Sequence, residues 1–186
     1  MTSAELLAAG GVLAIPTESS YGLGVDPRDS AGVEAIYRLK GRERGKPLPV
    51  VAADVAQLLA LGVEPAAGAL AWAGPRWPAA LTVVLPLAAP IPASAGGLTI
   101  AARIPAHDGL RALLLELGHA LTATSANPSG EPPYTDPAEV TAWLAASGEK
   151  YLVVEQGGTA GGAPSTLVEI DDEKVTILRQ GRVEVR

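Results

Sequence analysis

The sequence contains no cysteine and no phenylalanine, and it has one methionine and two histidines among its 186 residues. Without cysteine the chain can form neither a disulfide scaffold nor a zinc site built on thiolates. The two histidines, His107 and His119, are too few for a histidine-rich metal cage. The sequence therefore predicts no metal site made by the chain itself.

Positive charge is also scarce, because 14 Lys and Arg residues face 20 Asp and Glu residues and give a net charge of -6. Proteins that coat nucleic acid or anionic membranes without specificity do so mainly through Lys and Arg that meet phosphate groups. The composition argues against that class of protein. Any contact with phosphate must be confined to one part of the molecule.

Long apolar runs are absent as well. The apolar share of 48% comes largely from 34 alanines, and no run approaches the roughly 20 residues that a membrane-spanning helix needs. The N-terminal segment contains Glu5 and no basic residue, which argues against a cleaved signal peptide. We therefore expect a cytoplasmic protein. One domain is expected, because a chain of about 150 residues already buries about 70% of its unfolded surface.

Strand and helix patterns alternate along most of the chain, which is typical of the α/β class. Capping patterns mark helix starts at Thr2 with Glu5, at Asp54 with Gln57, and at Asp136 with Pro137 in the first turn. The expected helices are 2–10, 30–39, 54–61, 65–73, 110–117 and 136–146, and the expected strands are 12–15, 48–52, 81–85, 98–104, 120–124, 151–155, 166–170 and 175–178. Residues 17–29 are expected to form a loop, and the last strands are expected to pair antiparallel.

The basic residues that do occur are crowded at one place. Five of the 14 lie at alternate positions of one segment: Arg38, Lys40, Arg42, Arg44 and Lys46. A helix C-terminus explains one or two of them, and a solvated surface explains the others only if acids are interleaved, where Glu43 is the sole acid. A ligand with several negative charges, such as a polyphosphate, is favoured. The segment is not a P-loop, because it has one residue too few between its glycines and Pro47 where Ser or Thr is required.

Three further polar segments follow or precede expected strands. In 124–130, Ser125 and Asn127 lie two positions apart and present hydrogen-bonding groups on the same side, although a plain turn is equally compatible. Segment 16–24 carries four hydroxyl side chains and Glu18, which suits a polar small-ligand pocket or a hydroxyl-capped turn. The third is 164–169, a strand entry after glycines, with Arg179 further along.

Taken together and in order, these segments are specific. They are Pro16-Thr17-Glu18-Ser19-Ser20-Tyr21-Gly22-Leu23-Gly24, Lys40-Gly41-Arg42 with Lys46-Pro47-Leu48, Trp77-Pro78 with Leu81-Thr82, Ala102-Arg103-Ile104-Pro105, Ser125-Ala126-Asn127-Pro128-Ser129-Gly130, Pro164-Ser165-Thr166-Leu167-Val168, and Leu178-Arg179. In these motifs the sequence resembles the YrdC-like threonylcarbamoyl-AMP synthases over residues 4–182, in their short bacterial form. The resemblance implies a single domain with an open, twisted, mixed sheet flanked by helices and a concave electropositive cavity.

The resemblance also implies a reaction. L-threonine, bicarbonate or CO2, and ATP give L-threonylcarbamoyladenylate and pyrophosphate, and Mg2+ accompanies the ATP. A downstream tRNA threonylcarbamoyl transferase then uses the product to modify tRNA, so that contact of this chain with tRNA is expected to be indirect. The family is not expected to carry a protein-bound prosthetic group, and no membrane is involved.

Site residues follow from the matching positions. The resemblance implies catalytic roles for Lys40, Arg42, Ser125 and Asn127, ATP contacts for Arg42, Lys46, Thr99, Asn127, Thr135 and Arg179, and threonine contacts for Ser19, Arg103, Ser125 and Ser165. The chain departs from the family pattern at four places. Ser19 stands where Thr is usual, Lys46 stands where Asn is frequent, Val51 replaces a His that touches threonine in longer members, and Ala79-Ala80 replaces Gly-Pro.

Two other functions compete with this interpretation. A module that binds double-stranded RNA without catalysis would use a basic concave surface, but the few basic residues and only seven Trp and Tyr offer few phosphate contacts and few stacking platforms. A related carbamoyl-adenylate domain serves hydrogenase maturation within much longer chains that carry zinc-finger parts. The absence of cysteine argues against that domain.

Overall fold

The computed structural model describes residues 1–155, 157–171 and 174–185, and it confirms the α/β class. The helices are α1 (Ser3–Ala8), α2 (Ser30–Lys40), α3 (Val55–Leu61), α4 (Gly68–Ala73), α5 (Asp108–Leu117) and α6 (Pro137–Ala145), with short 3-10 turns η1 (Gly74–Arg76) and η2 (Pro92–Ser94). The strands are β1 (Val12–Pro16), β2 (Tyr21–Gly24), β3 (Val50–Val51), β4 (Leu81–Pro86), β5 (Thr99–Arg103), β6 (Leu121–Thr122), β7 (Thr124–Ser125), β8 (Tyr151–Val153), β9 (Thr166–Asp171) and β10 (Lys174–Arg179).

The helix starts predicted from capping residues are confirmed. Thr2 and Glu5 form a reciprocal capping box, and the side chains of Asp54 and Asp136 accept hydrogen bonds from Gln57 N–H and Ala138 N–H. These caps satisfy backbone donors that a helix N-terminus would otherwise leave unpaired. None of the helices that the structure describes is long and apolar enough to span a bilayer.

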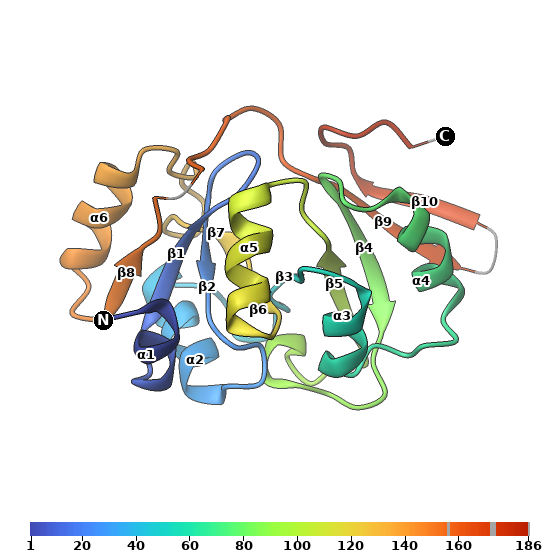
Figure 1. The fold of residues 1–186 in the computed structure, drawn as a ribbon, viewed down its shortest axis with the longest axis horizontal. Helices are drawn as coiled ribbons and strands as arrows, with labels where there is room; N and C mark the ends of the chain where they lie inside the picture. The colour runs from blue at the N-terminus through green and yellow to red at the C-terminus, as the bar shows by residue number, and fades with distance from the viewer. Residues whose placement is uncertain (156, 172–173, 186) are drawn as a thin grey trace.

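The expected mixed sheet is present, and its strands divide into two hydrogen-bonded sheets. The first has the order β7-β2-β1-β8 and the second the order β10-β9-β4-β5-β3-β6. Both combine parallel and antiparallel pairs, and β9 and β10 pair antiparallel as predicted. In Figure 1 the first sheet lies on the left with α6 and the second on the right with α4, and α5 lies in front between them.

One prediction was wrong, because residues 17–29 are not a loop throughout. Residues Tyr21–Gly24 form β2, which pairs antiparallel with β1 in a register that joins Pro16 to Tyr21 and Leu13 to Gly24. Alternating glycines have little intrinsic preference for strands. Here β2 is buried along its whole length and pairs with β7 on its other side, so tertiary contacts override the local preference.

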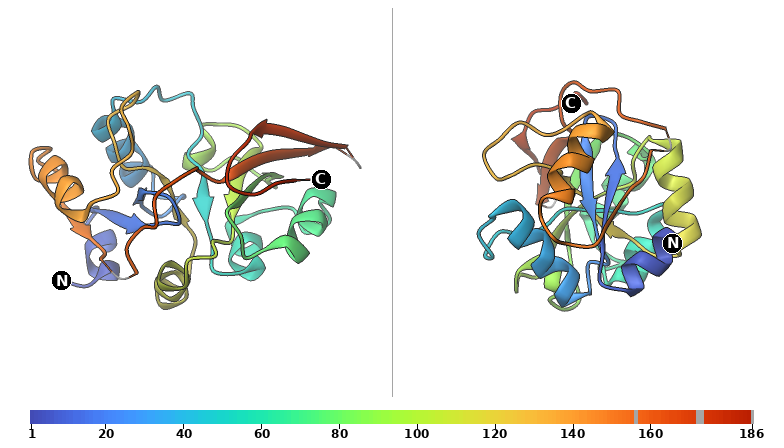
Figure 2. Two further views of the ribbon diagram at one scale, coloured as in Figure 1. Left: turned by 90° about the horizontal axis from the view of Figure 1, so that it is seen from above. Right: turned by 90° about the vertical axis from the view of Figure 1, so that its left-hand side faces the viewer.

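The two sheets are joined where the chain passes from β6 to β7 through Ala123. The hydroxyl of Thr122 accepts a hydrogen bond from Val25 N–H at 3.0 Å and donates one to Leu23 O at 2.9 Å. Helix α5 contributes to an apolar cluster with both sheets, which contains Leu110, Leu113 and Leu114 together with Leu13, Ile15 and Val51. The views of Figure 2 show the sheets from above and from one end of the molecule. The Thr122 hydrogen bonds and the apolar cluster around α5 hold the two sheets against each other.

Candidate functional site

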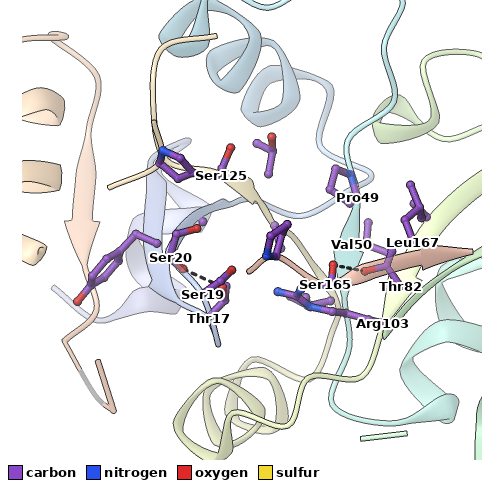
Figure 3. A pocket seen from close by; sticks show the side chains of 18 of the residues that line it. Thr17, Ser19, Ser20, Pro49, Val50, Thr82, Arg103, Ser125, Ser165 and Leu167 are labelled. Carbon is purple, nitrogen blue, oxygen red and sulfur yellow. Dashed lines mark hydrogen bonds between the residues drawn. The ribbon is translucent and has the colours of Figure 1, made fainter. Parts of the chain in front are cut away.

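A cavity of about 700 Å3 opens between the two sheets, which is a usual size for a small-molecule site. In Figure 3, Thr17, Ser19, Ser20 and Ser125 of the first sheet and its turn lie on one side, and Thr82, Arg103, Ser165 and Leu167 of the second lie on the other. The described residues that line it are Thr17, Ser19, Ser20, Tyr21, Gly22, Arg42, Pro47, Pro49, Val50, Val51, Thr82, Ala101, Arg103, Ala123, Thr124, Ser125, Pro133, Thr135, Gly162, Pro164, Ser165, Leu167 and Arg179.

All four residues predicted to contact threonine line this cavity. They are Ser19, Arg103, Ser125 and Ser165. Ser165 is buried, and its hydroxyl lies 2.8 Å from the hydroxyl of Thr82. Arg179, predicted as an ATP contact, donates to Ser165 O at 2.9 Å and to Ser165 Oγ at 3.1 Å. A residue predicted to contact threonine, Ser165, is therefore hydrogen-bonded to a residue predicted to contact ATP, Arg179.

Arg103 is the most buried cation of the cavity. It ends β5, and its guanidinium lies 3.3 Å from a carboxylate oxygen of Glu18, with both side chains about one-tenth exposed. Burial lowers the pKa of the Arg103 guanidinium; Glu18 acts in the opposite direction, and Arg179 adds to the lowering. Arginine stays protonated in proteins, and Arg103 Nε is buried without a hydrogen-bond partner. Arg103 thus places a largely buried positive charge in the lining of the cavity, which suits a carboxylate ligand.

Lys40 leaves the end of α2 and is buried beneath the segment 125–127. Its ammonium donates to Ser125 O at 2.5 Å, to Asn127 O at 2.9 Å and to Asn127 Oδ1 at 3.1 Å. An ammonium has three donors, so all three are used on this one segment. Lys40 therefore holds the backbone of Ser125 and Asn127 and the Asn127 side chain in one arrangement.

A second, smaller cavity of about 430 Å3 shares Arg42 and Ser125 with the first. It is lined by Lys40, Gly41, Arg42, Glu43, Lys46, Ser125, Asn127, Ser129 and Gly130. Of the four predicted catalytic residues, Arg42 and Ser125 line both cavities, whereas Lys40 and Asn127 line the smaller one, as does Lys46. Thr135 lines the larger cavity. Thr99 lines neither: it is exposed at the start of β5, opposite Pro86.

Two of the five basic residues of 38–46 form ion pairs with acids elsewhere in the chain. Arg38 forms an ion pair with Glu149 at 2.7 Å, and Arg44 forms one with Glu34. Both arginines are exposed, and neither lines a cavity described above. The sequence argument counted only acids within the segment, whereas these acids come from elsewhere in the chain. The site keeps Lys40, Arg42 and Lys46.

The amino group of Lys40 is expected to titrate within an accessible pH range. Burial, with a further contribution from the nearby Arg42 charge, lowers its pKa to about 8. The unfolded chain retains the ordinary value of about 10.5 and binds more protons between these two pH values, so this group's contribution to stability rises with pH across that interval. Lysine-selective NMR should show a midpoint near pH 8 for the resonance that disappears in Lys40→Arg. A midpoint near 10.5 would contradict the burial argument.

Several residues of the cavity were missed by the sequence analysis as site residues. Thr17 and Ser20 fold the first wall, because the amide and hydroxyl of Thr17 both donate to Ser20 O. Thr82 supports Ser165 from the neighbouring strand β4. The sequence signal for Thr82 is that it is a polar residue within an otherwise apolar, buried strand of branched side chains. Val51, which replaces the histidine of longer relatives, also lines the cavity.

The chain matches the Sua5/YciO/YrdC family model, described as telomere recombination, over residues 5–181. The chain belongs to this family. It is 37% identical to a threonylcarbamoyl-AMP synthase of Thiobacillus denitrificans over 91% of this chain and 89% of the relative. It is also 37% identical to a protein of the same name from Alkalilimnicola ehrlichii, over 95% of this chain and 92% of the relative.

Solved structures of the family agree with the fold. Sua5 of P. abyssi in complex with L-threonine superposes with a TM-score of 0.83 at 32% identity, over 96% of this chain and 53% of the Sua5 chain. The present chain therefore spans about half the length of that Sua5. The E. coli YciO structure, with a TM-score of 0.81 at 24% identity over 99% of this chain and 89% of its own, supports the fold alone.

Proposed function

We propose that this chain is a threonylcarbamoyl-AMP synthase, which converts L-threonine, bicarbonate or CO2, and ATP to L-threonylcarbamoyladenylate and pyrophosphate. The observation that carries the proposal is the cavity between the sheets, which gathers a buried arginine, paired hydroxyls and further cations within one space. Relatives that carry this name match the chain at 37% identity over most of both lengths.

The chemistry requires charge neutralisation more than a protein nucleophile. The threonine amine forms a C–N bond to the carbon donor and loses a proton, which gives a carbamate. When bicarbonate is the donor, its C–OH bond breaks and the hydroxide leaves with that proton as water. A carbamate oxygen then attacks the α-phosphorus of ATP, and the bond to pyrophosphate breaks. Both reacting partners are anions, so positioned cations supply most of the stabilisation. Arg103, Arg42 and Lys46 are available for that task.

The two cavities divide the substrates. Threonine occupies the part of the larger cavity between Ser19, Ser125 and Ser165, with its carboxylate on Arg103. ATP lies toward the smaller cavity, where Arg42, Lys46 and Asn127 contact it, and it extends into the larger cavity toward Thr135 and Arg179. Thr99, which is exposed and lines neither cavity, is not retained as a contact. Lys40 acts through the segment 125–127, because it donates to the backbone carbonyls of Ser125 and Asn127 and to Asn127 Oδ1 and so holds this segment beside Arg42.

Magnesium enters this proposal with the substrate. Among the residues that the structure describes, no group of three or more His, Asp or Glu side chains could hold a metal ion. Mg2+ prefers oxygen ligands and is commonly bound through substrate phosphates with few protein groups. ATP phosphates beside Arg42 and Lys46 meet that requirement, and the ion would supply further neutralisation of the triphosphate.

The wider role follows from the product. We propose that the chain acts in the cytoplasm as a single domain over residues 4–182, and that a tRNA threonylcarbamoyl transferase consumes the adenylate. Contact with tRNA would then be indirect, which agrees with the net charge of -6. Pyrophosphate release tests the activity: it should need ATP, bicarbonate and threonine together. Equal turnover with carbamoyl phosphate in place of threonine and bicarbonate would overturn it.

Ser165→Ala tests the threonine end of the cavity. The substitution removes the hydroxyl that contacts Thr82 and accepts one bond from Arg179, while the bonds from Arg179 to Ser165 O remain possible. We expect the KM for threonine to rise about ten-fold, the effect of losing roughly one hydrogen bond, and the KM for ATP to change less. Steady-state pyrophosphate release with each substrate varied in turn measures both constants. Equal changes in the two would show that the substrates are not divided in this way.

A further inference from the structure

Glu18 stands beside the cavity without lining it. It lies in the turn between β1 and β2, and its neighbours Thr17 and Ser19 both line the cavity. The turn is fixed, because the Thr17 amide and hydroxyl both donate to Ser20 O, at 3.1 and 2.7 Å. The Glu18 side chain is 11% exposed and points to the other sheet, where Arg103 lies. No role has been assigned to Glu18 so far.

The carboxylate of Glu18 makes two contacts with the end of β5. One oxygen accepts a hydrogen bond from Ala106 N–H at 2.9 Å. The other lies 3.3 Å from Arg103 Nη2. Glu18 comes from the first sheet, whereas Arg103 and Ala106 belong to the second sheet and the loop that follows it. One side chain therefore crosses between the sheets and fixes the arginine that faces the cavity.

Stability alone is a poor explanation for this pair. Two charged side chains that are only 10% and 11% exposed lose much of their hydration. The electrostatic attraction within such a buried pair often does no more than offset this loss of hydration free energy. The ion pair also leaves hydrogen-bonding capacity on both side chains, because Glu18 Oε2 and Arg103 Nε are both buried without a hydrogen-bond partner. The carboxylate beside the guanidinium restricts where its charge lies, and the guanidinium donors stay available for a ligand.

We propose that Glu18 is a positioning residue, which orients the Arg103 guanidinium toward the carboxylate of L-threonine. The inference rests on the proposed function and deepens it. A competing arrangement has Glu18 occupy the place of the substrate carboxylate and leave when threonine binds. The anchor on Ala106 and the position of Glu18 outside the cavity lining favour the positioning role.

Glu18→Gln separates the two arrangements. The variant removes the charge while keeping the size of the side chain and an oxygen that can accept from Ala106 N–H. The buried ion pair with Arg103 is lost, so we expect the KM for threonine to rise about ten-fold or more, roughly 1.4 kcal/mol or more. The KM for ATP should change by less than about two-fold, which is smaller than the change expected from the loss of one hydrogen bond. If Glu18 competes with the substrate, the KM for threonine will fall. A fall, or no change, would overturn the proposal.

Matched variants control for indirect effects. Glu149→Gln removes another ion-paired glutamate, the partner of Arg38 outside both cavities, and should leave both KM values unchanged. Glu18→Asp keeps the charge on a shorter side chain, and its KM for threonine should fall between those of the parent and Glu18→Gln. Thermal unfolding checks that each variant is folded. If Glu18→Gln does not fold, Glu18→Asp replaces it in the test. The KM of Glu18→Asp for threonine must then exceed that of the parent protein.

A double-mutant cycle with Arg103→Lys asks whether Glu18 acts through Arg103. Residues that share one interaction give non-additive effects, so the double variant should bind threonine about as poorly as Arg103→Lys alone. Full additivity would overturn the positioning role. Absence of threonine-dependent pyrophosphate release in the parent protein would instead contradict the proposed function, so the two failures are distinguishable.

Discussion

Arg103→Lys is expected to raise the KM for threonine by about 10- to 150-fold, which corresponds to the loss of one hydrogen bond between charged groups. The side chain is buried at the end of β5 beside Glu18 and lies on the same side of the cavity as Ser165. Lysine retains a charge, but it presents a point donor where arginine presents a planar fork. It cannot serve Glu18 and a substrate carboxylate with the same geometry.

Steady-state kinetics with threonine and ATP varied separately measure this effect. The KM for ATP should change by less than about three-fold, because ATP binding should lose less free energy than one hydrogen bond contributes. Arg38→Lys is the control, because Arg38 is exposed, pairs with Glu149 and lines neither cavity. An Arg103→Lys enzyme with an ordinary KM for threonine would remove Arg103 from the carboxylate site.

Lys40→Met is expected to lower kcat/KM for ATP by about 100-fold or more, because the variant leaves three acceptors of the segment 125–127 without a donor. A buried acceptor that loses its partner costs about 1–3 kcal/mol, and removal of a desolvated charge offsets part of that cost. We therefore expect a folded protein that is about 1–3 kcal/mol less stable, with Ser125 and Asn127 displaced.

Denaturant unfolding and kinetics test the two parts of this prediction together. Lys150→Met is the matched control, because Lys150 is exposed, lies away from both cavities and makes a single bond to Ala9 O. The kinetic loss should exceed what the unfolded fraction explains. If Lys40→Met keeps normal turnover, the ammonium neither positions Ser125 and Asn127 nor helps catalysis.

The features that sequence predicted well are those set by neighbours along the chain. The start of α6 at Pro137 follows from Asp136 and the proline in the first turn, which together satisfy or remove local donors. The sequence motifs predict Ser19, Arg103, Ser125 and Ser165 as site residues, and the fold brings them to one cavity. Their individual contacts with substrate remain predictions.

The features that sequence missed depend on partners far along the chain. Strand β2 exists because β1 and β7 flank it, although its alternating glycines indicate a loop. Arg38 and Arg44 belong to a basic cluster that, in the sequence, favours an anionic ligand. In the structure they form ion pairs with Glu149 and Glu34. Glu18 and Thr82 become meaningful only when the two sheets place them against Arg103 and Ser165. No local pattern encodes such pairings.

The most direct test of the account follows the carbon donor into the product. The protein is incubated with ATP, L-threonine and 13C-bicarbonate, and the products are separated and analysed by mass spectrometry alongside pyrophosphate. The account predicts 13C-labelled L-threonylcarbamoyladenylate in amounts equal to the pyrophosphate, and neither product when threonine is omitted. Pyrophosphate release that continues without threonine, or release without a labelled adenylate, would contradict it.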